Sequence, residues 1–195
     1  MGFAHIGGYS GATGLAYAVA VAASAAVGEE IIFRGVVFRI TEEGFGTLVA
    51  LVLSATLFGL LHGFNPGASP VSMAAIALEA GILLALAYTA TRSLWLPIGL
   101  HFGWNFTEGG VFGAPVSGNS AHGLISSTLS GDPLWTGGAF GPEASLAAVL
   151  VCLIASLAFL AITVRRGNWQ PARLRIRMSQ IAAADAEGIP SSPSN

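Results

Sequence analysis

The sequence contains no lysine and only one cysteine, and it is poor in charge of either sign. Its 195 residues carry eight arginines and ten acidic side chains, so charged residues make up 9% of the chain, against about 25% in soluble proteins. Cys152 alone can form neither an intrachain disulfide nor a cysteine-based metal cluster. With a net charge of −2 and no lysine, nucleic acid is not an expected partner.

Apolar residues, by contrast, make up 53% of the chain, and the mean hydropathy is +0.71. These values fit neither a soluble domain nor a disordered chain, which would have many charges and few apolar residues. Asp, Glu, Lys and Arg are missing from four long stretches, residues 1–28, 44–78, 93–107 and 144–164. Because a transmembrane helix needs about 20 apolar residues, the sequence predicts an all-α, polytopic membrane helix bundle surrounded by lipid.

We predict five transmembrane helices, at about 12–40, 46–64, 71–91, 94–108 and 144–164. The first follows the N-terminus almost at once and is long enough to project beyond the membrane. The Gly-, Pro- and Ser-rich residues 109–143 are predicted to form a long loop, part of which folds back as a lid or re-entrant segment. The helices form one transmembrane domain, residues 1–166, followed by a cytoplasmic, disordered tail, residues 167–195.

The arginines predict the orientation, since positive charge collects on the cytoplasmic side of a membrane. Five of the eight follow the last predicted helix: Arg165, Arg166, Arg173, Arg175 and Arg177. Counting back through alternating spans puts Arg39 at the inner end of the first helix and Arg92 in the inner turn before the fourth. The sequence therefore predicts an integral, multi-pass protein with a cytoplasmic C-terminus.

Three ionisable side chains lie within the first predicted helix, although a charge at the bilayer centre costs about 2.5–3.5 kcal/mol. Glu30 and Arg34 are four residues apart in the favourable order for a helical ion pair. Glu29 points about 100° away around the helix, so it can face a different cavity. The pair could be purely structural, but one carboxylate held by arginine would leave the other free for chemistry.

The other predicted helices carry His62, Glu79, His101 and, one turn after His101, Asn105. A single intramembrane histidine can be an interhelical hydrogen-bond partner, and we interpret the isolated Glu79 as structural or gating. Gly59, Gly99 and Gly103 are interpreted as sites of close helix approach. The functional interpretation depends on the whole set, because two glutamates, two histidines and an asparagine on three spans are hard to explain as packing.

These residues fall into three ordered motifs, EEIIFRG (29–35), FGLLH (58–62) and HFGWN (101–105). They resemble the E-E-x-x-x-R, F-x-x-x-H and H-x-x-x-N motifs of the CPBP family of intramembrane proteases. That family includes type II CAAX prenyl endopeptidases and bacterial Abi-type, bacteriocin-processing and self-immunity proteins. The resemblance implies an intramembrane endopeptidase, in a bacterial plasma membrane, whose substrate is a membrane-anchored peptide, prenylated or bacteriocin-like. It implies these catalytic residues: Glu29, Glu30, Arg34, His62, His101 and Asn105.

Two mechanisms use these side chains equally well. In one, Glu29 and His62 activate a water while His101 and Asn105 stabilise the oxyanion. In the other, Glu29, His62 and His101 hold a catalytic Zn²⁺ with water in the fourth position.

The helix lengths place Glu29 and His101 at similar depths, but put His62 about 22 Å from Thr47. We expect a cavity reached from the cytoplasmic side.

Two other classes of function remain open. One is a catalytically inactive immunity or scaffold protein that retains the fold, because the family usually has further helices before the double glutamate. The other is a redox or transport protein, with His62 and His101 as haem ligands or the glutamates as a proton relay. The oligomeric state is not predicted.

The orientation can be tested directly. Because all eight arginines are predicted on one side, a reporter fused after Asn195 should be cytoplasmic, and a tag inserted within residues 118–123 should be accessible from outside. Protease protection of both markers in intact cells measures this. The opposite pattern of accessibility would contradict the predicted number of spans.

Overall fold

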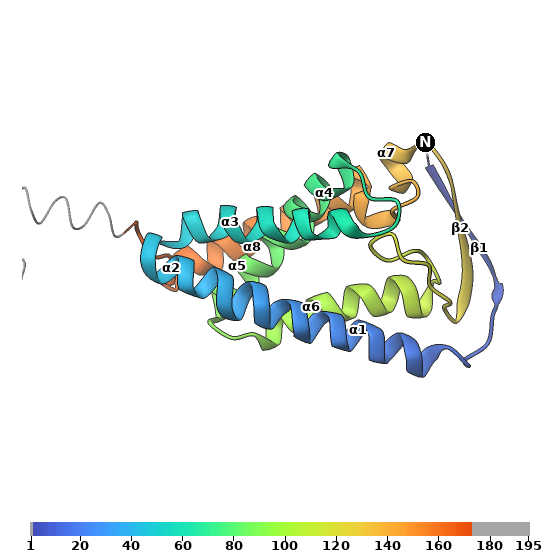
Figure 1. The fold of residues 1–195 in the computed structure, drawn as a ribbon, viewed down its shortest axis with the longest axis horizontal. Helices are drawn as coiled ribbons and strands as arrows, with labels where there is room; N and C mark the ends of the chain where they lie inside the picture. Colours follow the sequence, from blue (N-terminus) through green and yellow to red (C-terminus); the bar gives the residue numbers. More distant parts are fainter. Residues whose placement is uncertain (1, 173–195) are drawn as a thin grey trace, which may run out of the picture.

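The computed structural model describes residues 2–172, and within them the predicted helical bundle is confirmed (Figure 1). The first helix runs without interruption through α1 (Leu15–Glu30), η1 (Ile31–Phe38) and α2 (Arg39–Phe45). The rest of the bundle consists of α3 (Thr47–Leu61) with η2 (His62–Phe64), α4 (Pro70–Ile76) with η3 (Ala77–Gly81) and α5 (Ile82–Thr91), α6 (Trp95–Asn105) with η4 (Phe106–Val111), and α8 (Leu146–Arg165). Two short helices, α7 (Pro133–Thr136) and η5 (Pro142–Ala144), lie before α8.

Four of these helices are long and apolar enough to cross a membrane: Leu15–Phe45, Thr47–Phe64, Pro70–Thr91 and Leu146–Arg165. The fourth predicted span, residues 94–108, corresponds to α6 and η4, which together are shorter than these four helices. Large apolar side chains such as Ile32, Val52 and Ile154 point outward along the bundle. An apolar exterior is what a bilayer requires, so the chain is an integral membrane protein.

Local sequence explains where the helices begin and end. Gly46, with a φ of 87°, makes the tight turn between α2 and α3. Ser69, directly before Pro70, forms a capping box with Ser72 at the start of α4. The hydroxyl of Ser145 caps α8 by accepting a hydrogen bond from the backbone N–H of Ala148.

A two-stranded antiparallel sheet, which the sequence patterns did not predict, lies at one end of the bundle (Figure 1). Strand β1 (Gly2–Tyr9) pairs with β2 (Ile125–Gly131), in a register that puts His5 opposite Thr128. The expectation that the chain enters the first helix almost at once is therefore wrong. A strand from the predicted loop 109–143 pairs with the N-terminus, a long-range contact that local patterns do not indicate.

Two glycines let the second and third helices of the bundle approach closely. A Cβ at Gly59 would lie 2.4 Å from the carbonyl oxygen of Met73, and a Cβ at Gly81 would lie 2.9 Å from Cα of Ala55. Close approach at Gly59 was predicted. At Gly99 and Gly103 that prediction is wrong, because an added Cβ would meet no described atom within 4 Å at either position.

The opposite end of the bundle from the sheet is closed by polar contacts. Arg92, in the turn before α6, forms an ion pair with the buried carboxylate of Glu42. The side chain of Asn168 donates to the carbonyl oxygens of Thr89 and Ala90, and the backbone N–H of Gln170 donates to the hydroxyl of Thr47. The first residues of the predicted tail thus contact the helix ends, and the tail from residue 173 onward lies outside the described residues.

This end also resolves the depth of His62. The first helix continues six residues past Arg39 to Phe45, which is about 9 Å. Thr47, at the start of α3, therefore lies about 9 Å farther along the bundle from Glu29 than Arg39 does. From there, the 22 Å rise along α3 returns His62 to the level of Glu29.

The Gly59 contact makes a quantitative prediction. Gly59→Val should lower the free energy of unfolding by about 1–3 kcal/mol, because overpacking forces the two helices apart. Gly44→Ala is the matched control, since a Cβ there meets nothing within 4 Å. Thermal unfolding of both variants in detergent measures the difference, and equal midpoints would show that the Gly59 contact does not limit packing.

Candidate active site

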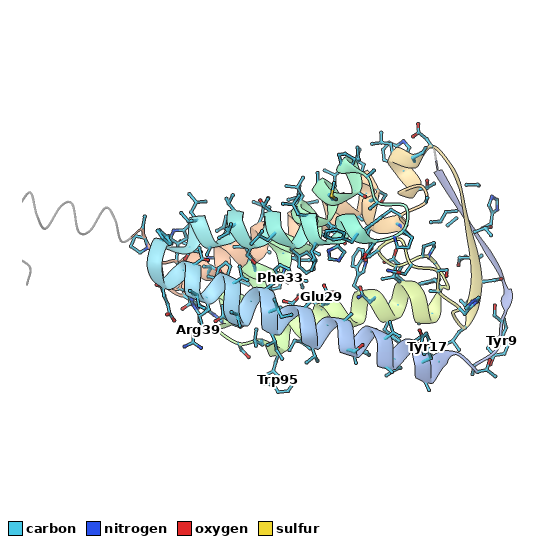
Figure 2. All side chains as sticks on the ribbon, in the orientation of Figure 1. Tyr9, Tyr17, Glu29, Phe33, Arg39 and Trp95 are labelled. Atoms are coloured by element: carbon cyan, nitrogen blue, oxygen red, sulfur yellow. The ribbon has the colours of Figure 1, made fainter. Side chains whose placement is uncertain are left out.

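The three sequence motifs come together midway along the bundle, although they lie on three separate helices. Glu29 and Glu30 end α1, His62 follows the last turn of α3, and His101 lies on α6 beside α1. Figure 2 places Glu29 between Tyr17, near the sheet, and Arg39, toward the opposite end of the bundle. The structure therefore assembles the predicted residues into one site.

Glu30 and Arg34 form a fully buried ion pair at the base of this site. Nη1 of Arg34 lies 2.8 Å from Oε1 of Glu30, and both side chains are 0% exposed. The second guanidinium nitrogen, Nη2, donates to the carbonyl oxygens of Ala80 and Gly81, at 3.0 and 3.2 Å. Arg34 lies in the π-helical segment η1, and its two acceptors lie in or at the end of another, η3. Wider helical turns of this kind are frequent at functional sites.

Both histidines are oriented by a hydrogen bond at Nδ1. Nδ1 of His62 lies 2.7 Å from the carbonyl oxygen of Phe58, and Nδ1 of His101 lies 3.0 Å from Oε1 of Glu30. A carbonyl or carboxylate oxygen only accepts, so each Nδ1 carries the proton. Nε2 of each ring is consequently directed toward the interior of the site.

Glu29 lies between the two Nε2 atoms. Its Oε2 is 4.0 Å from Nε2 of His62 and 4.0 Å from Nε2 of His101. That oxygen is buried and has no hydrogen-bond partner among the described residues, whereas the side chain as a whole is 30% exposed. The predicted division of the two glutamates is thus reproduced in geometry: arginine holds Glu30, and Glu29 is free.

The spacing bears on whether a metal or a water fits between these atoms. Two atoms 4.0 Å apart subtend about 90° at a water placed about 2.8 Å from each, about 20° below the tetrahedral angle and within the range of hydrogen-bond geometry. At a zinc ion about 2.1 Å from each, the angle would be about 145°, far from tetrahedral. Within residues 2–172, no group of three or more His, Cys, Asp or Glu side chains is placed to hold a metal ion. The distances therefore fit a hydrogen-bonded water better than zinc.

Phe58 was not among the predicted site residues, yet its ring lies at the centre of the site. The ring is 1% exposed and stacks at a tilt on His62, with centroids 4.7 Å apart. The guanidinium carbon of Arg34 lies 4.5 Å from the ring centroid, and His101 makes an edge contact at 6.2 Å. The first residue of the F-x-x-x-H motif thus packs against both histidines and the arginine, and its place in that motif was the available signal.

An open groove of about 550 Å³ leads into the site. Glu29, His62, His101 and Asn105 all line it. The side chain of Asn105 can therefore contact a molecule that is bound there. From Glu29 the groove follows α1 toward its N-terminal end, beside the sheet. The expectation of a cavity reached from the arginine side is wrong, because buried side chains of η1 close that direction.

A smaller cavity of about 70 Å³ lies beside the histidines. Glu79 lines it, with Oε1 3.8 Å from Sγ of Cys152, so Glu79 is not isolated as predicted. Glu143 also lines it, and its Oε2 accepts hydrogen bonds from the backbone N–H and the hydroxyl of Ser117. Burial raises the pKa of Glu143, with the Ser117 hydrogen bonds opposing the shift. No local sequence pattern indicated that Glu143 anchors this loop.

The fold and site define a helical membrane protein with a carboxylate–histidine centre inside the bundle. The family model described as type II CAAX prenyl endopeptidase Rce1-like matches residues 11–107, a range that contains all three motifs. The chain belongs to this family and, at the level of the family, is a CAAX-type intramembrane protease. No curated protein and no solved structure matches the chain.

The two glutamates should differ in their contribution to stability. Glu30→Gln leaves Arg34 as a buried, unpaired charge and should destabilise the protein by about 3–5 kcal/mol. Glu29→Gln should have a much smaller effect, because Glu29 has no cationic partner at hydrogen-bond distance and is partly exposed. Thermal unfolding in detergent compares them, and equal midpoints would reject the assignment of Glu30 to Arg34.

Proposed function

We propose that the protein hydrolyses a peptide bond in a membrane-anchored substrate, with a water activated by Glu29 and His62. The observation that carries this proposal is the unpartnered Oε2 of Glu29, which is 4.0 Å from Nε2 of both histidines. A buried carboxylate oxygen without a partner is costly unless a ligand or water satisfies it. A water there lies at the end of a groove wide enough for a substrate.

In the first step the water donates one hydrogen bond to Glu29 and the other to Nε2 of His62, which is the acceptor nitrogen of that ring. These two bonds turn an oxygen lone pair toward the substrate carbonyl carbon. As the new C–O bond forms, Glu29 takes the proton of the water. The same carboxyl group then passes that proton to the leaving nitrogen, and the C–N bond breaks.

The negative charge that develops on the substrate oxygen is stabilised by His101 and Asn105, which line the same groove. In this role His101 is protonated on both nitrogens, donating Nδ1–H to Glu30 and Nε2–H to the oxyanion. Its positive charge and that of Arg34 together balance the two glutamates. A neutral set of charges suits a site inside a membrane-spanning bundle.

Metal dependence is a separate prediction. If Zn²⁺ binds, Glu29, His62 and His101 are the side chains that would hold it, and it would supply an acidic water. Because their spacing fits hydrogen-bonded water better, we favour the glutamate mechanism. Activity of the purified protein should therefore survive treatment with a chelator.

The two alternative functions differ in what they require of the site. A scaffold needs no free carboxylate, whereas Glu29 is left unpaired beside two oriented histidines. A haem bound by both histidines would need the space between their Nε2 atoms, where the Glu29 carboxylate lies 4.0 Å from each. Both observations favour the hydrolase.

The role of Asn105 separates an enzyme from a scaffold. If Asn105 donates to the oxyanion, Asn105→Ala should lower kcat by about 10²–10³-fold, with little change in KM. Thr107→Ala, exposed on the next turn of the same helix, should leave both constants unchanged. Glu29→Gln should abolish turnover.

The assay uses purified protein in detergent and two fluorogenic peptides with a lipid anchor. One peptide carries an uncharged, alanine-rich segment next to its anchor, and the other a prenylated C-terminus. Hydrolysis of neither by the parent protein would reject the proposed function. An unchanged kcat with a raised KM in Asn105→Ala would move Asn105 from catalysis to substrate binding.

A further inference from the structure

The groove has a direction. On the first helix, the residues that line it lie at positions 14 to 29, so none of them follows Glu29. On α6 and η4 they lie at positions 101 to 110, so none of them precedes His101. Because these helices run antiparallel side by side (Figure 1), both sets lead from the site to the sheet end of the bundle. The path along α1 from Glu29 to Leu15 is about 21 Å long.

The opposite direction is closed. Beyond Glu30, the side chains of Phe33, Arg34 and Phe38 are 5%, 0% and 0% exposed, and Phe38 packs edge-on against Tyr88. The remaining arginines that the structure describes, Arg39, Arg92, Arg165 and Arg166, belong to helix ends and turns at this closed end. By the positive-inside rule, the closed end faces the cytoplasm and the groove opens on the other side.

The two walls of the groove differ in chemistry. The α1 wall is mostly apolar: Ala18, Ala22 and Ala25 line it at helical spacing, together with Tyr17 and Val21. The facing wall carries uncharged polar side chains, with Asn65 on one side and Ser117, Asn119 and Ser120 on the other. Its backbone is held in place by Glu143, through the hydrogen bonds to Ser117.

These walls match one form of substrate. An extended peptide presents backbone N–H and C=O groups along its length, and the amide and hydroxyl side chains of the polar wall can pair with them. Its side chains on the α1 side would meet this mostly apolar wall, which favours apolar side chains. Beyond Glu29 and the two histidines of the site, the lining contains no Asp, Glu, Lys or Arg, so a charged segment in that part of the groove would have no partner of fixed charge.

We propose that the groove receives an extended, uncharged peptide segment from the side opposite the arginines, so that the substrate is an exported, membrane-anchored peptide and not a prenylated cytoplasmic C-terminus. This inference rests on the proposed function for the chemistry and on the arginine orientation for the side. It adds the substrate class and the face of the membrane from which the substrate arrives.

The test places single cysteines in a Cys152→Ala background, in vesicles of known orientation. Ala25→Cys lies in the groove one turn from Glu29. Ser130→Cys is an exposed control on β2, and Glu43→Cys is a control at the arginine end. A membrane-impermeant, cationic thiol reagent should modify Ala25→Cys and Ser130→Cys from one face and Glu43→Cys only from the other.

The rate of peptide cleavage is measured in the same vesicles with the alanine-rich, lipid-anchored peptide. Modification of Ala25→Cys should abolish its cleavage, whereas modification of Ser130→Cys should leave the rate unchanged. In a Glu29→Gln background, the uncleaved peptide should slow modification of Ala25→Cys, a readout that does not require turnover.

The outcomes separate this inference from the proposed function. Modification of Ala25→Cys only from the Glu43 face, or from neither face, would overturn the inference, and so would a modified protein that still cleaves. If the prenylated peptide protects Ala25→Cys and the alanine-rich peptide does not, the assigned substrate class is wrong. Protection by the alanine-rich peptide without hydrolysis in the parent protein would support the groove and reject the enzyme.

Discussion

The buried pair of Glu30 and Arg34 is the interaction on which the rest of the site depends. Both side chains are fully buried, so neither charge can be solvated and each must be satisfied within the protein. Glu30 meets this requirement by also binding His101 from α6, and Arg34 by binding two carbonyl groups of the third helix and the ring of Phe58. One ion pair thus links the helices that carry the three motifs.

The same pair makes two adjacent glutamates chemically different. Glu30 is committed to a cation and a histidine, whereas Glu29 turns into the groove with a buried oxygen that has no partner among the described residues. Adjacent positions on a helix face directions about 100° apart, which is enough to place one carboxylate in the packed interior and the other at a wet surface. A carboxylate held in an ion pair and one without a hydrogen-bond partner at its buried oxygen can therefore share a single turn of helix.

The family match ends at residue 107, before the loop that completes the groove. Ser117 and its neighbours form the polar wall, and Glu143 holds that wall from the start of the last helix. The three motifs of the family and the polar wall of the groove are thus supplied by different parts of the chain. This division would let one catalytic centre serve different substrates, since loops tolerate change more readily than buried helices do.

The sequence alone determined the helical membrane class, the helix positions to within a few residues, and the candidate site residues, because hydrophobic length, charge spacing and three short motifs are local features. It also determined that Glu30 and Arg34 could pair, since i and i+4 share a helix face. The β1–β2 sheet, the central place of Phe58, the anchoring role of Glu143 and the side on which the groove opens were decided only by tertiary structure. Each depends on contacts between segments far apart in the chain, such as Gly2 with Gly131 or Ser117 with Glu143, and no local pattern encodes which distant segments will meet.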